Sequence, residues 1–385
     1  MRISNLCDNR DGGTRTVSMD LDWEEAEHSL DRLYFEADGE TADLFHPSPD
    51  PFVIACLPLA GWLGERRLIV EGAICTRLEK GLKALNEVYS RWFPNVQRVS
   101  MEPTEGFVAR SPPPERHLAS MLSGGVDGLA SLRRNRLDYP LGHPNSIRAC
   151  ITLFGIGTYD VTEEGPSDDR LRTFESLLER LGKLAGEEHF DLLPVRTNVR
   201  RIAPDYRAWT KVGFGAGHIA AAQLFQGSFD RVLFSSDGDG PDPPPGAMHP
   251  LTNFGYSTGA LTVQSDQDEM RRSEKVALLA DWEAGRRWMQ PCHHIEIPGE
   301  GKINCGSCEK CVRTMLVLIG LGRLDEVDAF RGMDVSPEKI RRIPIHNRRK
   351  LNLLLDSLPL LEEAGRDDLV KAIRRRARKY RFRRK

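Results

Sequence analysis

The order of apolar segments in the middle of the chain predicts an α/β fold. Short apolar runs with strand character alternate with longer stretches whose apolar residues recur at helical spacing. The predicted strands are 117–122, 148–154, 190–195 and 231–235, and the predicted helices are 128–136, 168–184 and 215–225. This alternation favours a parallel sheet with helices on both faces, and ligands of such folds bind beyond the carboxyl ends of the strands.

The first 110 residues are expected to form a small α+β domain with a structural or partner-binding role. Strands are predicted at 17–21, 32–37 and 67–71, and a helix at 76–92 that Pro94 ends. The apolar segment 51–63 fits either a strand or a buried helix. The stiff run Ser111-Pro112-Pro113-Pro114 then indicates a domain boundary, because consecutive prolines form extended linkers.

A glycine-rich stretch, Ser123-Gly124-Gly125-Val126-Asp127-Gly128, separates the first central strand from the helix that follows it. Adjacent glycines allow a tight turn with exposed backbone N–H groups, and the start of a helix adds more of them. Such a turn binds anions, usually phosphates. A carboxylate at Asp127 suits a magnesium ion that bridges to the phosphate. The alternative is an ordinary turn with Asp127 as the helix N-cap.

Half of the eight cysteines fall within twenty residues, as Cys292, Cys305, Cys308 and Cys311. Four thiolates at this spacing fit a tetrahedral zinc ion, and a site with no open position is structural rather than catalytic. His293 and His294 are possible substitute ligands. An iron–sulfur cluster and a set of free thiols are the alternatives.

Three further segments contain candidate binding residues. The long loop 236–250 follows a predicted strand and includes Asp237 and His249, so it is expected to line a site. The segment 211–218 has glycines beside Lys211 and fits either a second phosphate or nucleoside contact or close helix packing. Arg271, Arg272 and Lys275 begin a helix and could hold phosphate oxygens, or form a solvated charged face.

Composition narrows the classes of partner. The net charge of −2 gives no overall attraction to nucleic acid, and no apolar run is long enough to span a bilayer. The N-terminal segment lacks the apolar core of a signal peptide, and the cysteine pattern favours reduced thiols, so a cytoplasmic location is expected. Residues 371–385 contain ten lysines or arginines. This basic tail could bind nucleic acid or an acidic partner, remain solvated, or dock on the protein itself.

The glycine-rich stretch resembles the Ser-Gly-Gly-x-Asp-Ser loop of the PP-loop ATP pyrophosphatase superfamily. Together with Cys292 and the run from Cys305 to Arg313, it resembles the 7-cyano-7-deazaguanine synthases of the queuosine pathway, over about residues 116–320. Gly128 departs from the pattern, since that superfamily usually has serine there. The flanking regions lie outside the similarity, which indicates an extended relative of the kind found in bacterial antiviral systems.

The resemblance implies a PP-loop (HUP-like) nucleotide-binding domain over 115–325. A helical extension is expected over 326–385, where residues 367–377 show a weakly amphipathic helical pattern. It implies an ATP-dependent C–N ligase that uses Mg²⁺, contains Zn²⁺ and adenylates 7-carboxy-7-deazaguanine with release of pyrophosphate. An amide or nitrile then forms, with ammonia or a protein partner as the amine donor. A homo-oligomer is expected.

The implied residue roles follow the same resemblance. Asp127 would hold magnesium, and Ser123 and Lys275 would join it in catalysis. Phosphates would be held by Ser123, Gly124, Gly125, Val126 and Gly128, with Arg271 and Arg272 adding charge. Asp237, His249 and Lys211 would contact the substrate. The alternatives are a tRNA-modifying PP-loop enzyme of the thiolase or lysidine type, and a non-catalytic component that binds a nucleotide or a deazaguanine.

Overall fold

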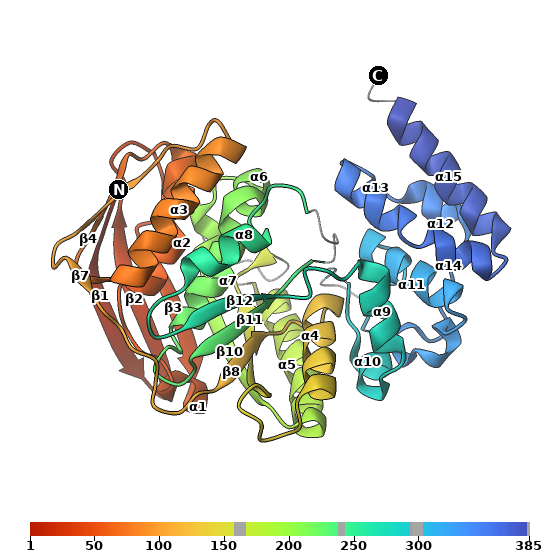
Figure 1. Ribbon diagram of the computed structural model, residues 1–385, viewed down its shortest axis with the longest axis horizontal. Coiled ribbons are helices and arrows are strands. Elements are labelled where there is room, and N and C mark those ends of the chain that lie inside the picture. The colour runs from red at the N-terminus through yellow and green to blue at the C-terminus, as the bar shows by residue number, and fades with distance from the viewer. Residues whose placement is uncertain (158–166, 238–242, 293, 295–302, 383–385) are drawn as a thin grey trace.

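The computed structural model describes residues 1–157, 167–237, 243–292, 294 and 303–382, without the side chains of 381 and 382. Ten strands form one sheet in the order β12-β11-β8-β9-β10-β3-β2-β1-β4-β6 (Figure 1). Its strands are β1 (Arg2–Asp11), β2 (Thr14–Asp22), β3 (Arg32–Asp38), β4 (Arg67–Val70), β6 (Ser100–Pro103), β8 (Leu118–Met121), β9 (Ile147–Phe154), β10 (Asp191–Thr197), β11 (Arg231–Ser235) and β12 (Thr262–Asp266). Strands β5 (Ile74–Cys75) and β7 (Phe107–Val108) pair separately.

The half of the sheet from β12 to β10 is entirely parallel, as the alternating pattern predicts. The chain runs from β8 through β9 to β10 in one direction, then returns to place β11 on the other side of β8. The strand order therefore reverses between β8 and β11. In open parallel sheets, a crevice for ligands forms beyond the carboxyl ends of the strands at such a reversal.

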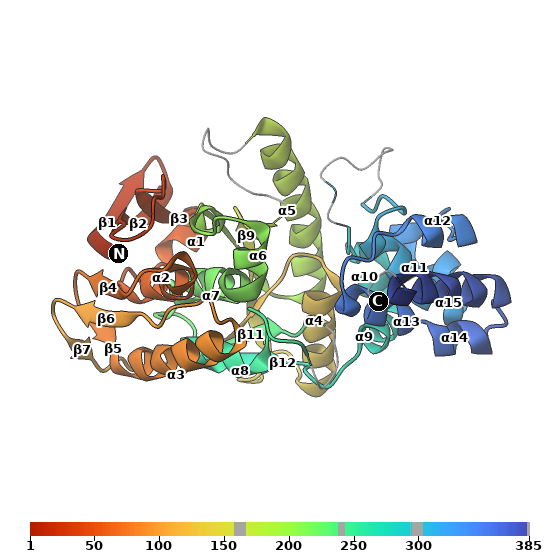
Figure 2. The ribbon, with the colours of Figure 1, turned by 90° about the horizontal axis from the view of Figure 1, so that it is seen from above.

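Helices surround the sheet and form a cluster at the C-terminal end of the chain. They are α1 (Gly39–Asp43), α2 (Asp50–Leu63), α3 (Thr76–Trp92), α4 (Val126–Asp138), α5 (Asp168–Glu188), α6 (Tyr206–Ala208), α7 (Phe214–Gln223), α8 (Pro250–Asn253), α9 (Arg272–Ala280), α10 (Glu283–Trp288), α11 (Glu309–Gly320), α12 (Pro337–Arg342), α13 (Arg348–Leu355), α14 (Leu358–Glu363) and α15 (Asp367–Phe382). Figure 2 shows α4 and α5 between the strands and the cluster α9–α15. The expected helical C-terminal region is confirmed.

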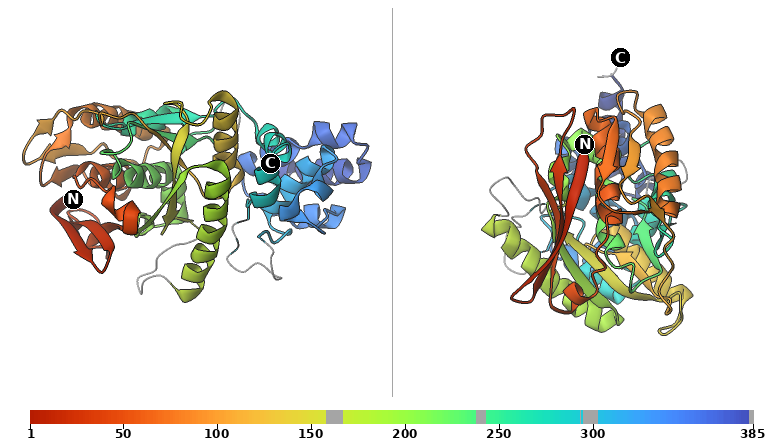
Figure 3. Two further views of the ribbon diagram at one scale, coloured as in Figure 1. Left: turned by 90° about the horizontal axis from the view of Figure 1, so that it is seen from below. Right: turned by 90° about the vertical axis from the view of Figure 1, so that its left-hand side faces the viewer.

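Two hydrophobic cores lie on opposite faces of the sheet. Alternate residues of β9 enter different cores, because successive side chains of a strand point to opposite faces: Ala149 and Ile151 join one, Cys150 and Phe154 the other. The first core contains α2, α3 and α7, and the second contains α4, α5 and the C-terminal helices. The two views of Figure 3 show the sheet and the helices beside it from below and from the N-terminal side.

The N-terminal residues, expected to form a unit of their own, continue the same sheet. Strand β3 pairs antiparallel with β10, and the buried side chain of Asn198 accepts a hydrogen bond from the Tyr34 N–H at 3.0 Å and donates to the Arg32 carbonyl at 2.9 Å. The first hydrophobic core also contains residues of both parts, from Met1 to Val263. Both backbone pairing and apolar burial therefore join the two parts.

Most predicted elements are confirmed, and the ambiguous segment 51–63 is a helix with a nearly all-buried surface. The expected pairing of the strands near 17–21 and 32–37 is present as β2 with β3. Strands β1 and β12 were not predicted, because β1 is mostly polar and exposed, and β12 is a short edge strand. Parts of the loops at 155–160 and 236–250 lie outside the described residues. Among the residues that are described, none of the helices combines the length and apolar character that a bilayer crossing requires.

The contact between α3 and the turn at residues 254–256 tests whether the N-terminal residues fold as one unit with the rest of the sheet. Gly81 of α3 lies so close to that turn that an added Cβ would be 2.1 Å from the Gly255 carbonyl oxygen. We expect Gly81→Ala to destabilise the whole chain by about 1–3 kcal/mol, because backbone must move to admit the methyl group. The free energy of unfolding from urea titration measures the effect.

The control is Gly182→Ala in α5, where an added Cβ meets no atom within 4 Å. Since alanine has the higher helix propensity, this variant should be neutral or more stable by about 0.5–1 kcal/mol. Equal stability of the two variants would contradict a tight junction at Gly81.

Candidate functional site

The glycine-rich loop lies at the reversal of strand order, directly after β8 and beside the end of β11. Gly124 has φ of +73°, a conformation that favours glycine, and Gly125 is the N-cap of α4. Val126 is buried and anchors the loop, whereas Ser123 is exposed. No backbone N–H group of residues 123–128 donates a hydrogen bond to another described residue. The turn therefore presents a series of unsatisfied donors at the positive end of a helix.

Gly128 allows α4 to start very close to β8. A Cβ added there would be 2.9 Å from the Met121 carbonyl oxygen and 3.3 Å from a methyl group of Leu122. Gly128, which replaces the serine usual in the PP-loop superfamily, therefore fits the close approach of α4 to β8. Because residue 128 has no hydroxyl, a phosphate at this turn would depend on backbone donors.

Asp127 is paired with two cations from α9. Its Oδ2 accepts a hydrogen bond from Arg272 Nη1 at 2.5 Å, and its Oδ1 lies 3.7 Å from Lys275 Nζ. Burial would raise the pKa of Asp127, but Arg272, Lys275 and Lys310 together lower that pKa below its ordinary value. The group is therefore an anion at neutral pH. Its Oδ1 is buried and has no hydrogen-bond partner among the described residues, which leaves an oxygen ligand free for a cation.

Lys275 connects α9 to the end of β11. Its side chain is fully buried, and Nζ donates a hydrogen bond to the Ser236 carbonyl oxygen at 2.7 Å. Arg271, by contrast, is 65% exposed and lies nearest to Asp356, at 3.9 Å. Of the three cations predicted at this helix, the structure brings Arg272 and Lys275 to the loop and directs Arg271 elsewhere.

A second set of cations approaches from α11 and α13. Arg313 and Lys350 contact the Glu309 carboxylate at 3.1 and 3.0 Å. Burial lowers the pKa of Arg313 to about 10, against the effect of Glu309 and together with repulsion from Arg272 and Arg349. Burial likewise lowers the pKa of Lys310, with Arg272 and Arg313 adding to the effect.

These neighbours define a basic cluster, in which cations outnumber carboxylates among the residues that the structure describes. Its cations are Arg272, Lys275, Lys310, Arg313, Arg349 and Lys350, and its carboxylates are Asp127, Asp237 and Glu309. The excess positive charge beside a turn of free N–H groups favours a polyanionic ligand. Three of these cations, Lys310, Arg349 and Lys350, are not among the predicted site residues. Lys310 could have been identified from the sequence, because it lies between Cys308 and Cys311.

The three predicted substrate residues occupy different surroundings. Asp237 forms an ion pair with Arg349 and so belongs to the basic cluster. Lys211 lies over the Phe93 ring at 5.3 Å and donates to the Pro245 carbonyl oxygen at 3.3 Å. His249 caps α8, where its Nδ1 accepts from the Leu251 N–H at 3.1 Å, and its ring lies 4.8 Å from that of Trp92. The contacts of His249 and Lys211 are therefore with the N-terminal aromatic residues and the 245–251 segment, and none is with residues 123–128.

The four predicted cysteine ligands come together. Their sulfur atoms all lie within 4.8 Å of one another, with Cys292 and Cys308 at 4.0 Å and Cys305 and Cys311 at 3.9 Å. Four sulfurs around a tetrahedral zinc ion are about 3.8 Å apart, given zinc–sulfur bonds of about 2.3 Å. The group can therefore hold a metal ion such as zinc. His294 contributes its backbone N–H, which approaches the Cys292 sulfur at 3.5 Å, and His293 lies outside the described residues.

Backbone geometry shapes the cysteine group. The N–H groups of Cys308 and Cys311 point to the sulfurs of Cys305 and Cys308 at 3.2 and 3.4 Å, an arrangement that stabilises thiolates. Gly306 has φ of +67°, and an added Cβ would be 2.7 Å from the Met333 sulfur. Because Cys308 is the N-cap of α11, the cysteine group sets the start of the helix that carries Lys310 and Arg313.

Comparison with known proteins gives no match: no family model, no curated protein and no solved structure matches the chain.

Replacement of one cysteine ligand tests the metal site. We expect Cys305→Ser to lower bound zinc from one ion to less than about half an ion per chain and to lower the melting temperature by about 5 °C or more. The reason is that three remaining thiolates bind the ion less tightly and α11 loses its anchored start. Mass spectrometry of bound metals and calorimetry measure the two effects.

Cys7→Ser, which changes an exposed cysteine of β1, is the control and should retain both values. Visible absorption and bound iron in the purified protein would instead identify an iron–sulfur cluster.

Proposed function

We propose that the chain is an ATP-dependent enzyme that activates a carboxylate by adenylation at residues 123–128. The observation that carries the proposal is the glycine-rich loop itself, whose free N–H groups lie at the reversal of strand order within an excess of positive charge. A triphosphate has the anionic oxygens that such a site can bind. The resemblance of the same loop to the PP-loop superfamily supports the choice of ATP.

The proposed arrangement gives each group a separate task. The N–H groups of the loop and the dipole of α4 would hold the leaving pyrophosphate, and Arg272 and Lys275 would neutralise its charge. Asp127 Oδ1 would ligate Mg²⁺, since it is a buried carboxylate oxygen that lacks a hydrogen-bond partner in the described chain. A magnesium ion at this oxygen would add Lewis-acid stabilisation of the phosphate charge.

The reaction balances as two substitutions. A carboxylate oxygen of the substrate attacks the α-phosphorus of ATP, the bond to the bridging oxygen breaks, and pyrophosphate leaves with its electron pair. The amine then attacks the activated carbonyl carbon, AMP leaves with the acyl oxygen, and the nitrogen loses a proton to solvent. The backbone donors at residues 123–128 stabilise the charge that develops on pyrophosphate, because they are already oriented before the reaction.

The substrate class comes from the resemblance of the loop and the cysteines to 7-cyano-7-deazaguanine synthases. It is a 7-deazaguanine carboxylate, which the two substitutions convert to an amide. A nitrile would require a second ATP to adenylate the amide oxygen, which then leaves with AMP while the nitrogen loses two protons. A protein acceptor in an antiviral system would make the product a conjugate. In either case the four cysteines would bind zinc structurally and keep Lys310 and Arg313 beside the phosphates.

Isotope exchange between pyrophosphate and ATP, in the presence of 7-carboxy-7-deazaguanine, tests the adenylation step. We expect exchange by the native chain and a loss of at least about 100-fold in Asp127→Asn, because the phosphate charge loses its metal ligand. Asp138→Asn is the control, since Asp138 ends the same helix, is exposed, and pairs only with Arg134 in the described structure.

The possible outcomes separate the alternatives. Saturable ATP binding without exchange would identify a non-catalytic nucleotide-binding component. Absence of ATP binding to the zinc-loaded chain would remove the whole proposal. Intact-mass analysis after co-expression with candidate protein partners would reveal a conjugate as a partner heavier by one deazaguanine acyl group.

A second candidate is a nucleic-acid acceptor, favoured by the surface of α15. The helix buries Leu369, Val370 and Ile373 against α12–α14, so it is docked rather than solvated on all sides. The opposite side exposes a row of cations, Lys371, Arg374, Arg375, Arg378 and Lys379. Such a row suits the regularly spaced phosphates of a nucleic acid. This arrangement supports a tRNA substrate for the same ATP-dependent chemistry.

Salt-dependent binding tests the nucleic-acid candidate. We expect the chain to bind tRNA, and the triple variant Arg375→Gln, Arg378→Gln and Lys379→Gln to reduce the slope of log affinity against log salt by about 2. The control changes Arg10, Arg66 and Arg98 to glutamine, which removes the same charge from exposed N-terminal positions. If the two variants had equal salt slopes, the basic face of α15 would not be the nucleic-acid binding surface.

A further inference from the structure

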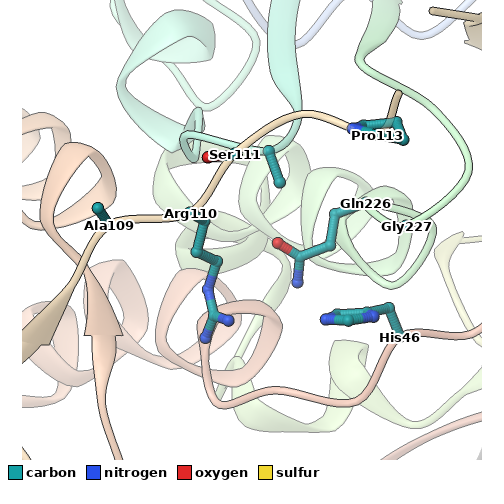
Figure 4. Close-up of a pocket in the computed structure, with 8 residues that line it drawn as sticks. His46, Ala109, Arg110, Ser111, Pro113, Gln226 and Gly227 are labelled. Atoms are coloured by element: carbon teal, nitrogen blue, oxygen red, sulfur yellow. The ribbon is translucent and has the colours of Figure 1, made fainter. Parts of the chain in front are cut away.

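A polar pocket lies at the edge of the sheet opposite the glycine-rich loop. Its volume is about 240 Å³, and its walls include His46, Arg110, Ser111, Gln226 and Gly227 (Figure 4). Residues 110–113 precede β8 and residues 226–227 precede β11, so the pocket is at the amino ends of these strands. The glycine-rich loop is at their carboxyl ends, and the pocket is therefore a separate site.

Arg110 is held rigidly in the pocket wall. Its Nε donates to the carboxylate of Asp50, which is fully buried and also accepts a hydrogen bond from the Cys75 N–H at 2.9 Å. The two terminal nitrogens of Arg110 make no hydrogen bond to another described residue. Since the buried carboxylate already orients the guanidinium, its two free donors can hold an oxyanion with little loss of side-chain entropy.

Gln226 supplies an acceptor that lacks a donor. The side chain is 2% exposed, and its Nε2 donates to Ser48 Oγ at 3.0 Å. Its Oε1 is buried and has no hydrogen-bond partner among the described residues. A buried carbonyl oxygen without a partner is unfavourable, so a ligand that donates a hydrogen bond here would gain affinity.

His46 completes the polar wall as a neutral ring. Burial and the nearby Arg110 lower the pKa of His46 below its ordinary value, so the ring is uncharged at neutral pH. Gly227 lies beside the ring, and a Cβ at that position would make an ordinary van der Waals contact with His46 Nδ1, at 3.4 Å. Figure 4 shows the side chains of His46, Arg110 and Gln226 turned toward one another.

We infer that this pocket binds a small organic oxyanion that also carries a hydroxyl or amide donor. The free edge of the Arg110 guanidinium holds the carboxylate or phosphate, and the donor of the ligand satisfies Gln226 Oε1. Ser111 and His46 border the same space and add polar contacts. A cavity of about 150 Å³ accepts benzene, so this pocket fits a molecule of roughly ten non-hydrogen atoms.

Isothermal titration of the zinc-loaded full-length chain tests the inference. The probes are glycerate and glycerol 3-phosphate, which carry hydroxyl donors, and acetate and sulfate, which do not. We expect at least one donor-bearing probe to bind at least about tenfold more tightly than acetate and sulfate. Glycerate against glycerol 3-phosphate distinguishes a carboxylate from a phosphate ligand.

Variants place the binding in the pocket. Gln226→Glu keeps the shape of the side chain and adds a negative charge, so it should weaken the best probe at least about tenfold. Gln97→Glu adds the same charge at an exposed position and should bind as the native chain does. If Gln226→Glu fails to fold, His46→Phe, which retains a ring but removes its polar atoms, takes its place with the same expectation.

The inference is overturned if neither glycerate nor glycerol 3-phosphate binds at least about tenfold more tightly than acetate and sulfate. It is also overturned if the folded pocket variant binds the best probe as tightly as Gln97→Glu does. Neither result affects the proposed ATP site, because that site is at the other edge of the sheet.

Discussion

The buried ammonium group of Lys275 is the interaction on which the arrangement of the site depends. A cation that is fully removed from water needs compensating partners, and here they are the Ser236 carbonyl oxygen and the Asp127 carboxylate. Ser236 directly follows β11 and Asp127 is in the first turn of α4, after β8, whereas Lys275 belongs to the C-terminal helical region. The requirement to satisfy this one charge therefore holds α9 against the edge of the sheet where the strand order reverses.

The cysteine group has a complementary role on α11. It sets the first turn of that helix, and the same turn carries Lys310 while Arg313 follows one turn later. Charges of like sign repel, so the cations of the basic cluster remain together only because the surrounding packing and the three carboxylates hold them. A polyanion would relieve this repulsion, which makes the site favourable for phosphates on electrostatic grounds.

The carboxyl and amino edges of the parallel strands differ in the number and arrangement of their charged groups. At the carboxyl edge, cations from three helices surround a turn of backbone donors. At the amino edge, a single arginine is fixed by the buried Asp50 beside the unpaired oxygen of Gln226. The first arrangement suits a ligand with several charges, and the second suits a small molecule with one anionic group and one donor.

Local features of this protein follow from its sequence alone. The parallel strands, most helices, the turn at residues 123–128 and the spacing of Cys305, Cys308 and Cys311 are all set by side-chain periodicity and backbone conformation within a few residues. The tertiary structure alone decided the pairing of β3 with β10, because Phe35 and Thr197 are partners without any local signal. It also brought Arg349 and Lys350 to the basic cluster and separated Arg271 from it. The physical reason is that such contacts depend on the burial of many apolar side chains at once, whereas a turn or a cysteine spacing depends only on its own neighbours.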